Sequence, residues 1–462
     1  MNDVKGRILD DDSVITALET LKKEAKEIGE KASETDNVMA EIGRVSAIYE
    51  PLAQGCSALF FTLDSLSNIN KLYQFSLNFF FEIFKNSIES GPAGVTDKND
   101  RLGKIIHSLF EQTYTRASRS LLHQDRICFM LLLAKIELEI FKEGACLSEL
   151  NHFLHNQEIM VSASEMANSS LDPSKFNESQ RENLIRLNRR LKQFGQVEQK
   201  IGSNQSMVES WMKGASSDSA PELYDITNDS QLWQAAQVLL LEQALRPSKV
   251  VAAVQTFCSA VFGSSFGNDD LTCGDVVNQV KPGQPIMLAS VAGTDASYVV
   301  DELARSLQKD MTSVAMGSPE GFDEAEKAIS SASRTGRWVL LKNVHLAPSW
   351  LQQLEKKLHS LGANQNFRLF LTAEISPKLP VNMLRTARIL TYEPPPGMKA
   401  SLTSTLANYE NRMGVQPAER ARVYFLLGWF HSVVQERMRY TPLGWSKLYE
   451  LSDAELRSGM GD

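Results

Sequence analysis

Residues 290–297, which read SVAGTDAS, are the first place where the residue types suggest a chemistry. They follow an apolar run and lead into a helical pattern, as a phosphate-binding loop of the form G-x-x-x-x-G-K-[ST] does. Ser290 and Asp295 stand where the two glycines belong, and Ala296 replaces the lysine. Gly293 lies inside the loop, and only Ser297 agrees with the pattern. The loss of the lysine removes the main positive charge, and the Asp295 carboxylate near the phosphate oxygens adds a repulsion of roughly several kcal/mol. We therefore expect no ordinary nucleotide affinity here.

A second position of the same kind is the end of the apolar run 337–343, RWVLLKN. In nucleotide-hydrolysing folds such a strand ends in acidic residues that hold Mg²⁺ and polarise water. Lys342 and Asn343 stand there instead. Two independent losses at one site argue against hydrolysis. We therefore expect no catalytic residue, no bound metal and no bound cofactor in this chain.

Other candidate residues carry weaker signals. His152 and His155 are three residues apart and Cys146 is nearby, but a metal site needs a fourth ligand, which is missing from this polar segment. His345 follows the run 337–343, where a structural hydrogen bond and a general-base role are the two alternatives. No serine or cysteine nucleophile with a supporting acid accompanies it.

The elements that must position these residues follow from the pattern after Pro282. Apolar runs alternate with helical patterns, which predicts a doubly wound parallel sheet whose ligand crevice lies at the carboxyl ends of the strands. The five expected strands are 285–291, 312–317, 337–343, 367–373 and 387–392. The expected helices between them are 297–309, 320–334, 348–361 and 380–386.

The N-terminal half is helical in pattern. Residues 13–49 follow a 4-3 apolar spacing over about five heptads, which indicates one strand of a coiled coil; the alternative is one amphipathic helix lying on a core. We expect Pro51 to end this helix. Lys5-Gly6-Arg7 resembles a helix-hairpin turn, so the partner strand is expected upstream of Met1, and the chain is expected to be a fragment.

Composition limits the function classes. The 462 residues are 43% hydrophobic and 23% charged, as in ordinary globular proteins, and the net charge of −8 gives no electrostatic footprint for nucleic acid. Five scattered cysteines without C-x-x-C spacing point to a reducing compartment. The most apolar window, 128–141, is too short and too charged to span a bilayer. These features predict an intracellular protein with no nucleic-acid partner and no membrane span.

Several blocks of the sequence resemble dynein heavy chains, and the cytoplasmic type more than the axonemal one. They are GSPEGFDEAEKAISSASRTGRWVLLKNVHLAPSWLQQLEKKLHSL (317–361), FRLFLTAEISPKLPVNMLRTARILTYEPPPGMKASL (367–402) and ERARVYFLLGWFHSVVQERMRYTPLGWSKLYELSDAELRS (419–458), together with shorter runs in 4–25, 120–138 and 244–257. The resemblance covers nearly the whole chain.

The resemblance implies an α/β plus all-α fold with an AAA+ sheet in the order 5-1-4-3-2. Its implied divisions are a coiled-coil buttress helix (1–49), the helical small subdomain of a fifth AAA+ module (50–160), a polar helical connector (161–235), the large subdomain of a sixth module (236–393) and a truncated helical small subdomain (394–462).

The same resemblance assigns the candidate residues. Ser290 to Ser297 would be a degenerate Walker A loop, Lys342 and Asn343 a degenerate Walker B end, and Thr372 a sensor-like residue. Arg385 or Arg388 would face the neighbouring module; the alternative is a solvated or salt-bridged arginine.

The implied function is that of a non-catalytic, force-transmitting part of an ATP-driven, minus-end-directed microtubule motor in the cytoplasm. ATP and Mg²⁺ would act at other modules of the parent chain. Implied partners are those modules and the stalk coiled coil, and for the parent chain microtubules, intermediate and light chains, and a second heavy chain. A free-standing α/β enzyme and a helical adaptor protein are the alternatives.

Overall fold

The structure is a computed structural model, and the chain forms two compact units, Met1–Ser57 and Ala58–Asp462. The described residues are 12–89, 98–142, 144–155, 160–214, 221, 223, 230–263, 266, 273–291, 294–408, 418–440, 442–445, 451 and 453–460. Within these ranges, no helix combines the length and apolar character needed to cross a bilayer.

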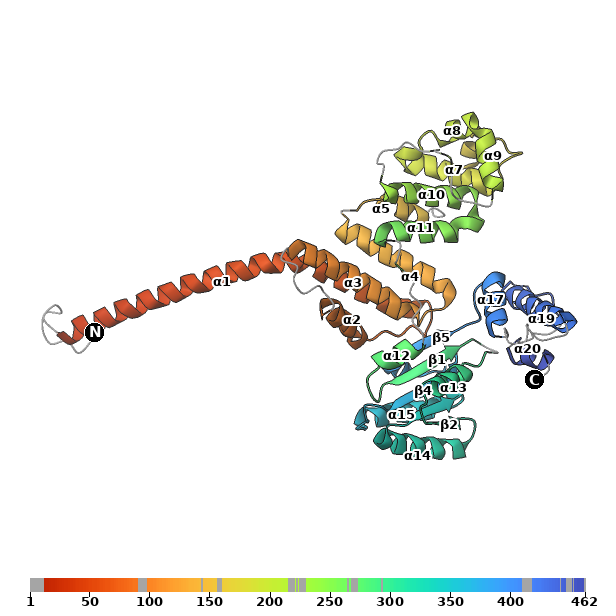
Figure 1. Cartoon of the computed structure of the whole chain (residues 1–462). Coiled ribbons are helices and arrows are strands. Elements are labelled where there is room, and N and C mark those ends of the chain that lie inside the picture. Colours follow the sequence, from red (N-terminus) through yellow and green to blue (C-terminus); the bar gives the residue numbers. More distant parts are fainter. Residues whose placement is uncertain are drawn as a thin grey trace. The chain divides into compact units, whose positions relative to one another are not determined.

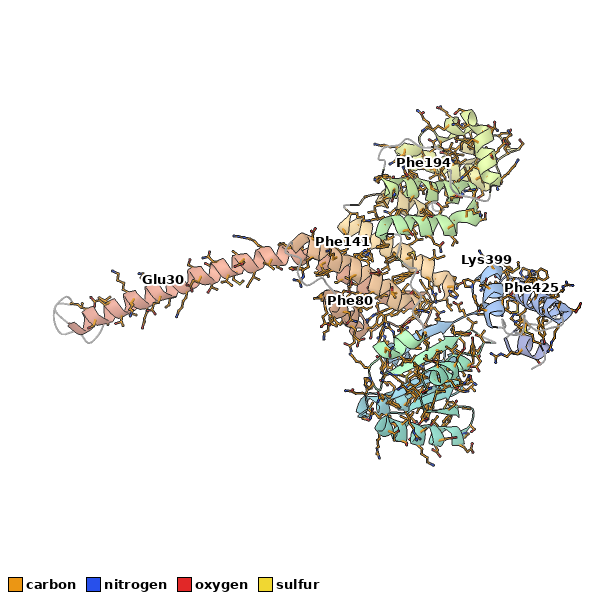
Figure 2. The ribbon with its side chains drawn as sticks, viewed as in Figure 1. Glu30, Phe80, Phe141, Phe194, Lys399 and Phe425 are labelled. Atoms are coloured by element: carbon orange, nitrogen blue, oxygen red, sulfur yellow. The ribbon has the colours of Figure 1, made fainter. Side chains whose placement is uncertain are left out.

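The long helix α1 (Asp12–Ser65) supplies the described part of the first unit (Figure 1). It carries Glu30 (Figure 2) and apolar residues of the predicted heptads. Leu18, Ile28 and Met39 are 59%, 67% and 63% exposed. The helix is confirmed, and its apolar seam has no covering partner among the described residues. The Lys5–Arg7 turn lies outside the described residues.

The expectation that Pro51 ends this helix is wrong, because α1 continues through it to Ser65. A proline inside a helix removes one backbone hydrogen bond and costs about 3 kcal/mol. Leu59 and Leu63 follow at a four-residue spacing and are fully buried. Burying a leucine side chain contributes about 1.5–3 kcal/mol, so the two together offset the proline.

The helical part of the second unit extends to Phe262. Its elements are α2 (Leu77–Glu89), α3 (Lys98–Ser118), α4 (His123–Ile136), the π-helical turn η3 (Glu137–Phe141), α5 (Leu147–His155), α6 (Ala163–Asn168), α7 (Glu178–Arg190), η5 (Lys192–Phe194), α8 (Val197–Ser203), α9 (Gln205–Lys213), α10 (Gln231–Leu245) and α11 (Val250–Phe262).

The described residues of 171–245, most of which fall in the expected polar connector 161–235, enclose a hydrophobic core of their own. Phe194 is fully buried among these helices (Figure 2). Leu184, Val197 and Leu240 are in the same cluster. Apolar residues spaced along short helices are diluted by the polar residues between them, so composition alone conceals this core. Helix α10 packs on α5, α7 and α11, and α11 on α4.

The sheet has five parallel strands in the order β2-β3-β4-β1-β5, which confirms the predicted order. The strands are β1 (Pro285–Ser290), β2 (Met311–Ala315), β3 (Trp338–Lys342), β4 (Arg368–Glu374) and β5 (Arg388–Tyr392). Helices α12 (Cys273–Gln279), α13 (Ser297–Ser306), α14 (Pro319–Thr335), α15 (Pro348–Ser360) and α16 (Val381–Thr386) flank it (Figure 1). The five strands and the four helices between them lie where the sequence predicts, within about three residues at each end.

The central strands are apolar on both faces. Trp338, Leu340 and Phe370 are buried in one cluster with residues of β1, α12 and α13.

Gly336 ends α14 in the left-handed region at φ 80° and donates its N–H to the carbonyl of Ala332 at 2.8 Å. A glycine adopts this conformation without steric cost, so the chain turns sharply from α14 into β3.

The edge strand β5 is joined by hydrogen bonds to the segment between α3 and α4. The backbone N–H of Thr391 donates to the carbonyl of Arg119 at 2.8 Å, and its hydroxyl lies 3.0 and 2.9 Å from the carbonyls of Arg119 and Leu121. The buried Ser120 hydroxyl donates to the carbonyl of Ile389 at 2.8 Å. This edge of the sheet is therefore covered by the helical segment.

Helices α17 (Met398–Asn408), α19 (Ala418–Arg437) and α20 (Asp453–Gly459) follow the sheet. Tyr424, Leu456 and Met460 form a small core between α19 and α20. Phe425 on α19 and Lys399 on α17 are marked in Figure 2. Phe425 is exposed, as are Trp429 and Phe430, so α19 keeps apolar side chains at the surface.

The turn at Gly336 generates a stability prediction. Alanine there would be held at positive φ, and its Cβ would lie 3.0 Å from Asn364 Oδ1. Gly336→Ala is therefore expected to lower the free energy of unfolding by about 1–2 kcal/mol, measured by denaturant titration. Gly362→Ala is the matched control, because nothing lies within 4 Å of its added Cβ. Equal stability of the two variants would contradict the prediction.

Candidate functional site

The carboxyl ends of β1, β4 and β3, which are neighbours in the sheet, bring three of the predicted site residues together. Ser297 begins α13 after β1, Thr372 lies in β4, and Asn343 follows β3. The Thr372 hydroxyl accepts a hydrogen bond from the N–H of Asn343 at 3.2 Å and lies 3.4 Å from the Ser297 hydroxyl. Ser297 and Thr372 are both buried. One threonine thus joins the loop after β1 to the end of β3.

The loop after β1 is closed by its own side chains. Asp295 Oδ1 accepts a hydrogen bond from the N–H of Ser297 at 2.8 Å, and the Thr294 hydroxyl donates to the carbonyl of Val291 at 2.6 Å. Ala296 is fully buried in the sheet core. A helix N-terminus offers its N–H groups to anions, and here a carboxylate of the chain occupies one of them. Ala292 and Gly293 lie outside the described residues.

The end of β3 is also internally paired. Lys342 Nζ lies 3.4 Å from Asp301 Oδ2 of α13, and both side chains are about one-third exposed. Asn343 adopts the left-handed conformation at φ 59° and precedes the short turn η7 (Val344–Leu346). Asp301 was not among the residues predicted for this site, although its position one turn after Ser297, on the same side of α13, was a signal for it.

His345 is a structural residue in this arrangement. Its Nδ1 accepts a hydrogen bond from the backbone N–H of Glu374 at 3.0 Å, and its Nε2 lies 3.8 Å from Glu374 Oε2. The histidine therefore bridges the ends of β3 and β4. Of the two alternatives for His345, the structure shows the structural hydrogen bond, which comes from the backbone N–H of Glu374.

Ser290, the first residue of the predicted loop, ends β1. Its side chain is buried and its hydroxyl lies 3.4 Å from the carbonyl of Ala373 in β4. The two strands pair in parallel here, with Ser290 opposite Glu374. Ser290 therefore serves strand pairing, away from the hydroxyl of Thr372.

Of the two predicted arginines, Arg385 lies in α16 and Arg388 is the first residue of β5. The Nε of Arg385 donates to Gln74 Oε1 at 3.3 Å, and the guanidinium of Arg388 lies 4.7 Å from the centre of the Phe79 ring. Burial, and then the neighbouring Arg116, lower the pKa of Arg388 to about 10. Both line a cleft of about 690 Å³ beside α2. Arg388 is thus held within this chain, and only Arg385 is exposed.

The histidine pair and Cys146 do not form a metal-binding cluster: among the described residues, no group of three His, Cys, Asp or Glu side chains is placed to hold an ion. Cys146 and His152 are buried, and His155 is exposed. Burial raises the pKa of the Cys146 thiol to about 12. That cysteine is therefore a poor ligand and a poor nucleophile at neutral pH.

A five-stranded parallel sheet in this order, with a loop and helix after β1 at the crevice, defines the AAA+ class of P-loop-like folds. Comparison with known proteins gives the family. The family model described as "Dynein heavy chain region D6 P-loop domain" matches residues 281–391, and "Dynein heavy chain AAA lid domain" matches residues 420–461.

Curated relatives agree with the family models. The chain is 46% identical over 99% of its length to "Dynein heavy chain, cytoplasmic" of Drosophila melanogaster, and 42% identical over its whole length to the protein of that name from Dictyostelium discoideum. It is 41% identical over 99% of its length to the protein of the same name from Caenorhabditis elegans. The chain belongs to the dynein heavy-chain family. It spans about 10% of the length of each of these relatives.

The junction at Thr372 leads to a second stability prediction. Thr372→Val keeps the shape of the side chain but removes the acceptor for the Asn343 N–H, so unfolding is expected to become easier by about 1–2 kcal/mol. Thr335→Val is the control, because its hydroxyl bonds to the Ser331 carbonyl on an exposed helix end. Chemical unfolding followed by circular dichroism compares them. A Thr372→Val variant as stable as the control would show that the junction contributes nothing.

Proposed function

We propose that this chain is a non-catalytic, structural and force-transmitting part of a dynein heavy chain, within an ATP-driven, minus-end-directed microtubule motor. The observation that carries the proposal is that side chains of this chain occupy the positions where nucleotide chemistry would occur. Asp295 accepts from the N–H of Ser297, and Lys342 pairs with Asp301.

The electrostatics support a lack of nucleotide binding. The position of the phosphate-binding lysine holds the buried Ala296, and the nearby Asp295 contributes a negative charge. Like charges about 4 Å apart repel by roughly 4 kcal/mol near a protein surface, which is a thousandfold in affinity. Lys342 and Asn343 replace the acidic residues that would hold Mg²⁺. ATP and Mg²⁺ would act at other modules of the parent heavy chain.

The hydrogen bonds at β5 support a mechanical role. Three contacts from Thr391 and one from Ser120 join the sheet to the α3–α4 segment, and Glu393 Oε2 accepts from the N–H of His123 at 2.7 Å. Several hydrogen bonds between two elements allow them to move as one body. A rotation of the sheet would thus be passed on to the helical segment.

The exposed apolar seam of α1 supports a coiled-coil role for the first unit. Leu18, Leu21 and Ile28 repeat at heptad spacing and are each more than half exposed. Such a seam gains stability when a second helix covers it. We propose that α1 is one helix of the buttress that braces the stalk, and that a further segment of the heavy chain supplies its partner.

The remaining partners are those of the parent motor. They comprise the neighbouring AAA+ modules, the stalk coiled coil, microtubules, intermediate and light chains, and a second heavy chain. The cytoplasm and its microtubules are the proposed location. The proposal is consistent with the relatives, which are named cytoplasmic dynein heavy chains.

Nucleotide binding tests the first part of the proposal. The sheet crevice is expected to bind no Mg-ATP, so isothermal titration should give the same result for the 462-residue chain and for Ser297→Ala, since the lysine and both acidic positions are lost. No hydrolysis above background is expected either. ATP turnover that disappears in Ser297→Ala, but persists in the control Ser306→Ala at the exposed end of α13, would overturn the assignment.

The mechanical role is tested in the full-length heavy chain. Thr391→Val removes two hydroxyl contacts to the α3–α4 segment and is expected to slow microtubule gliding several-fold while ATP binding by the motor is retained. Thr403→Val is the control, because its hydroxyl bonds only to the Lys399 carbonyl on an exposed helix. Hydrogen exchange of residues 119–123 reports whether the contact has opened. Normal velocity with an opened contact would refute force transmission through β5.

A further inference from the structure

A second cleft lies in the helical part of the second unit, away from the sheet. It has a volume of about 800 Å³ and is lined by residues of α5 and α7 together with Met160 and Leu191; Figure 1 shows where these two helices lie. Its lining residues are Ser148, Asn151, His152, His155, Met160, Arg189, Arg190 and Leu191. Two arginines and two histidines are among these eight described residues, and none of the eight is acidic. The cleft therefore has a positive lining in a chain of net charge −8.

His152 is the most unusual residue of this cleft. It is 7% exposed, and neither ring nitrogen has a hydrogen-bond partner among the described residues. Burial, together with the charges of Arg190 and Arg186, lowers its pKa to about 4. A neutral imidazole offers one donor and one acceptor, and leaving a buried polar group unsatisfied costs about 1–3 kcal/mol. A polar ligand in the cleft would satisfy the donor.

The arginines around His152 differ in their partners. Arg186 pairs with Glu182 at 2.9 Å, and Arg189 lies 3.6 Å from Glu165. Within the part of the chain that the structure describes, Arg190 has no ion pair, and it is exposed. Arg190 is therefore the cation with its full hydrogen-bonding capacity available to a ligand.

The acidic residue nearest to His152 on α5 is already engaged. Glu149 is buried; it accepts a hydrogen bond from Gln193 Nε2 at 3.1 Å and one from the Ser148 hydroxyl at 2.7 Å. It does not line the cleft. The positive lining is thus left without a carboxylate from α5.

We propose that this cleft is an oxyanion site that binds a small phosphate-bearing molecule, held by Arg190 and by a hydrogen bond from the His152 imidazole. A guanidinium group presents paired N–H donors that match two oxygens of a phosphate, which an ammonium group does not. Asn151 adds a neutral donor at the rim. This cleft and the sheet crevice are separate sites. The proposal of an oxyanion site therefore does not depend on whether the crevice has lost its nucleotide chemistry.

The lining also indicates which part of a ligand is recognised. Among the described lining residues, the two imidazoles are the only aromatic rings on which a nucleobase could stack, and Met160 and Leu191 are the apolar residues. Binding energy should therefore come from the phosphate groups. Pyrophosphate should bind at least as well as ATP, and both should bind better than inorganic phosphate because they carry more charge.

The test is titration of the 462-residue chain with pyrophosphate, ATP and inorganic phosphate, without Mg²⁺, by isothermal calorimetry. Pyrophosphate is expected to bind saturably, and Arg190→Gln is expected to weaken it about tenfold, as the loss of a charge-assisted hydrogen bond does. Lys192→Gln is the matched control. It removes one exposed cation two residues away that does not line the cleft, and it should change binding less than about twofold.

A second readout follows His152 directly. In histidine-labelled chain, the imidazole Cε1 resonance assigned by its loss in His152→Gln is expected to shift on addition of pyrophosphate, and to shift little in Arg190→Gln. Equal weakening by Arg190→Gln and Lys192→Gln would mean diffuse charge attraction and would overturn the site. An unshifted His152 resonance, or no saturable binding at 10 mM, would overturn it as well. Arg190 is exposed, so the Arg190→Gln result does not depend on a buried substitution.

Discussion

Burial of β1, β3 and β4 on both faces is the constraint on which the sheet region depends. Strands that are covered on both sides need apolar side chains at every position, and residues such as Leu340 and Phe370 meet that need. The apolar contacts hold the strands in one parallel order, and this order brings their carboxyl ends to one edge. The residues at those strand ends therefore lie side by side, whether or not they perform chemistry.

At this edge of the sheet, polar groups of the chain pair with one another. Thr372 takes the N–H of Asn343, Asp295 takes that of Ser297, and Lys342 has Asp301. In a P-loop enzyme the corresponding groups are left available for phosphate and Mg²⁺. In this chain the corresponding groups are paired with one another and need no ligand. These pairs hold the ends of the strands together, which is consistent with the structural role proposed for the chain.

The strands and helices of the sheet region could be predicted because strong periodicity and turn residues coincide there. Gly336 marks the end of α14, and the uninterrupted apolar run after it specifies β3. Elsewhere a prediction that rested on a single residue was wrong. Pro51 suggested a helix end, but buried leucines downstream outweigh its cost. In 171–245 the polar average concealed apolar residues that meet only when short helices pack.

Sequence alone determined the family resemblance, the sheet order and the residue types at the phosphate and magnesium positions. The residue types depend on identity at single positions, and the sheet order is what the resemblance implies. Only the tertiary structure decided which groups pair with one another: Thr372 with Asn343, Lys342 with Asp301, and His345 with Glu374. It also separated Arg388, stacked on Phe79, from the exposed Arg385. These pairings join residues far apart in the chain, and their geometry exists only after the strands have assembled.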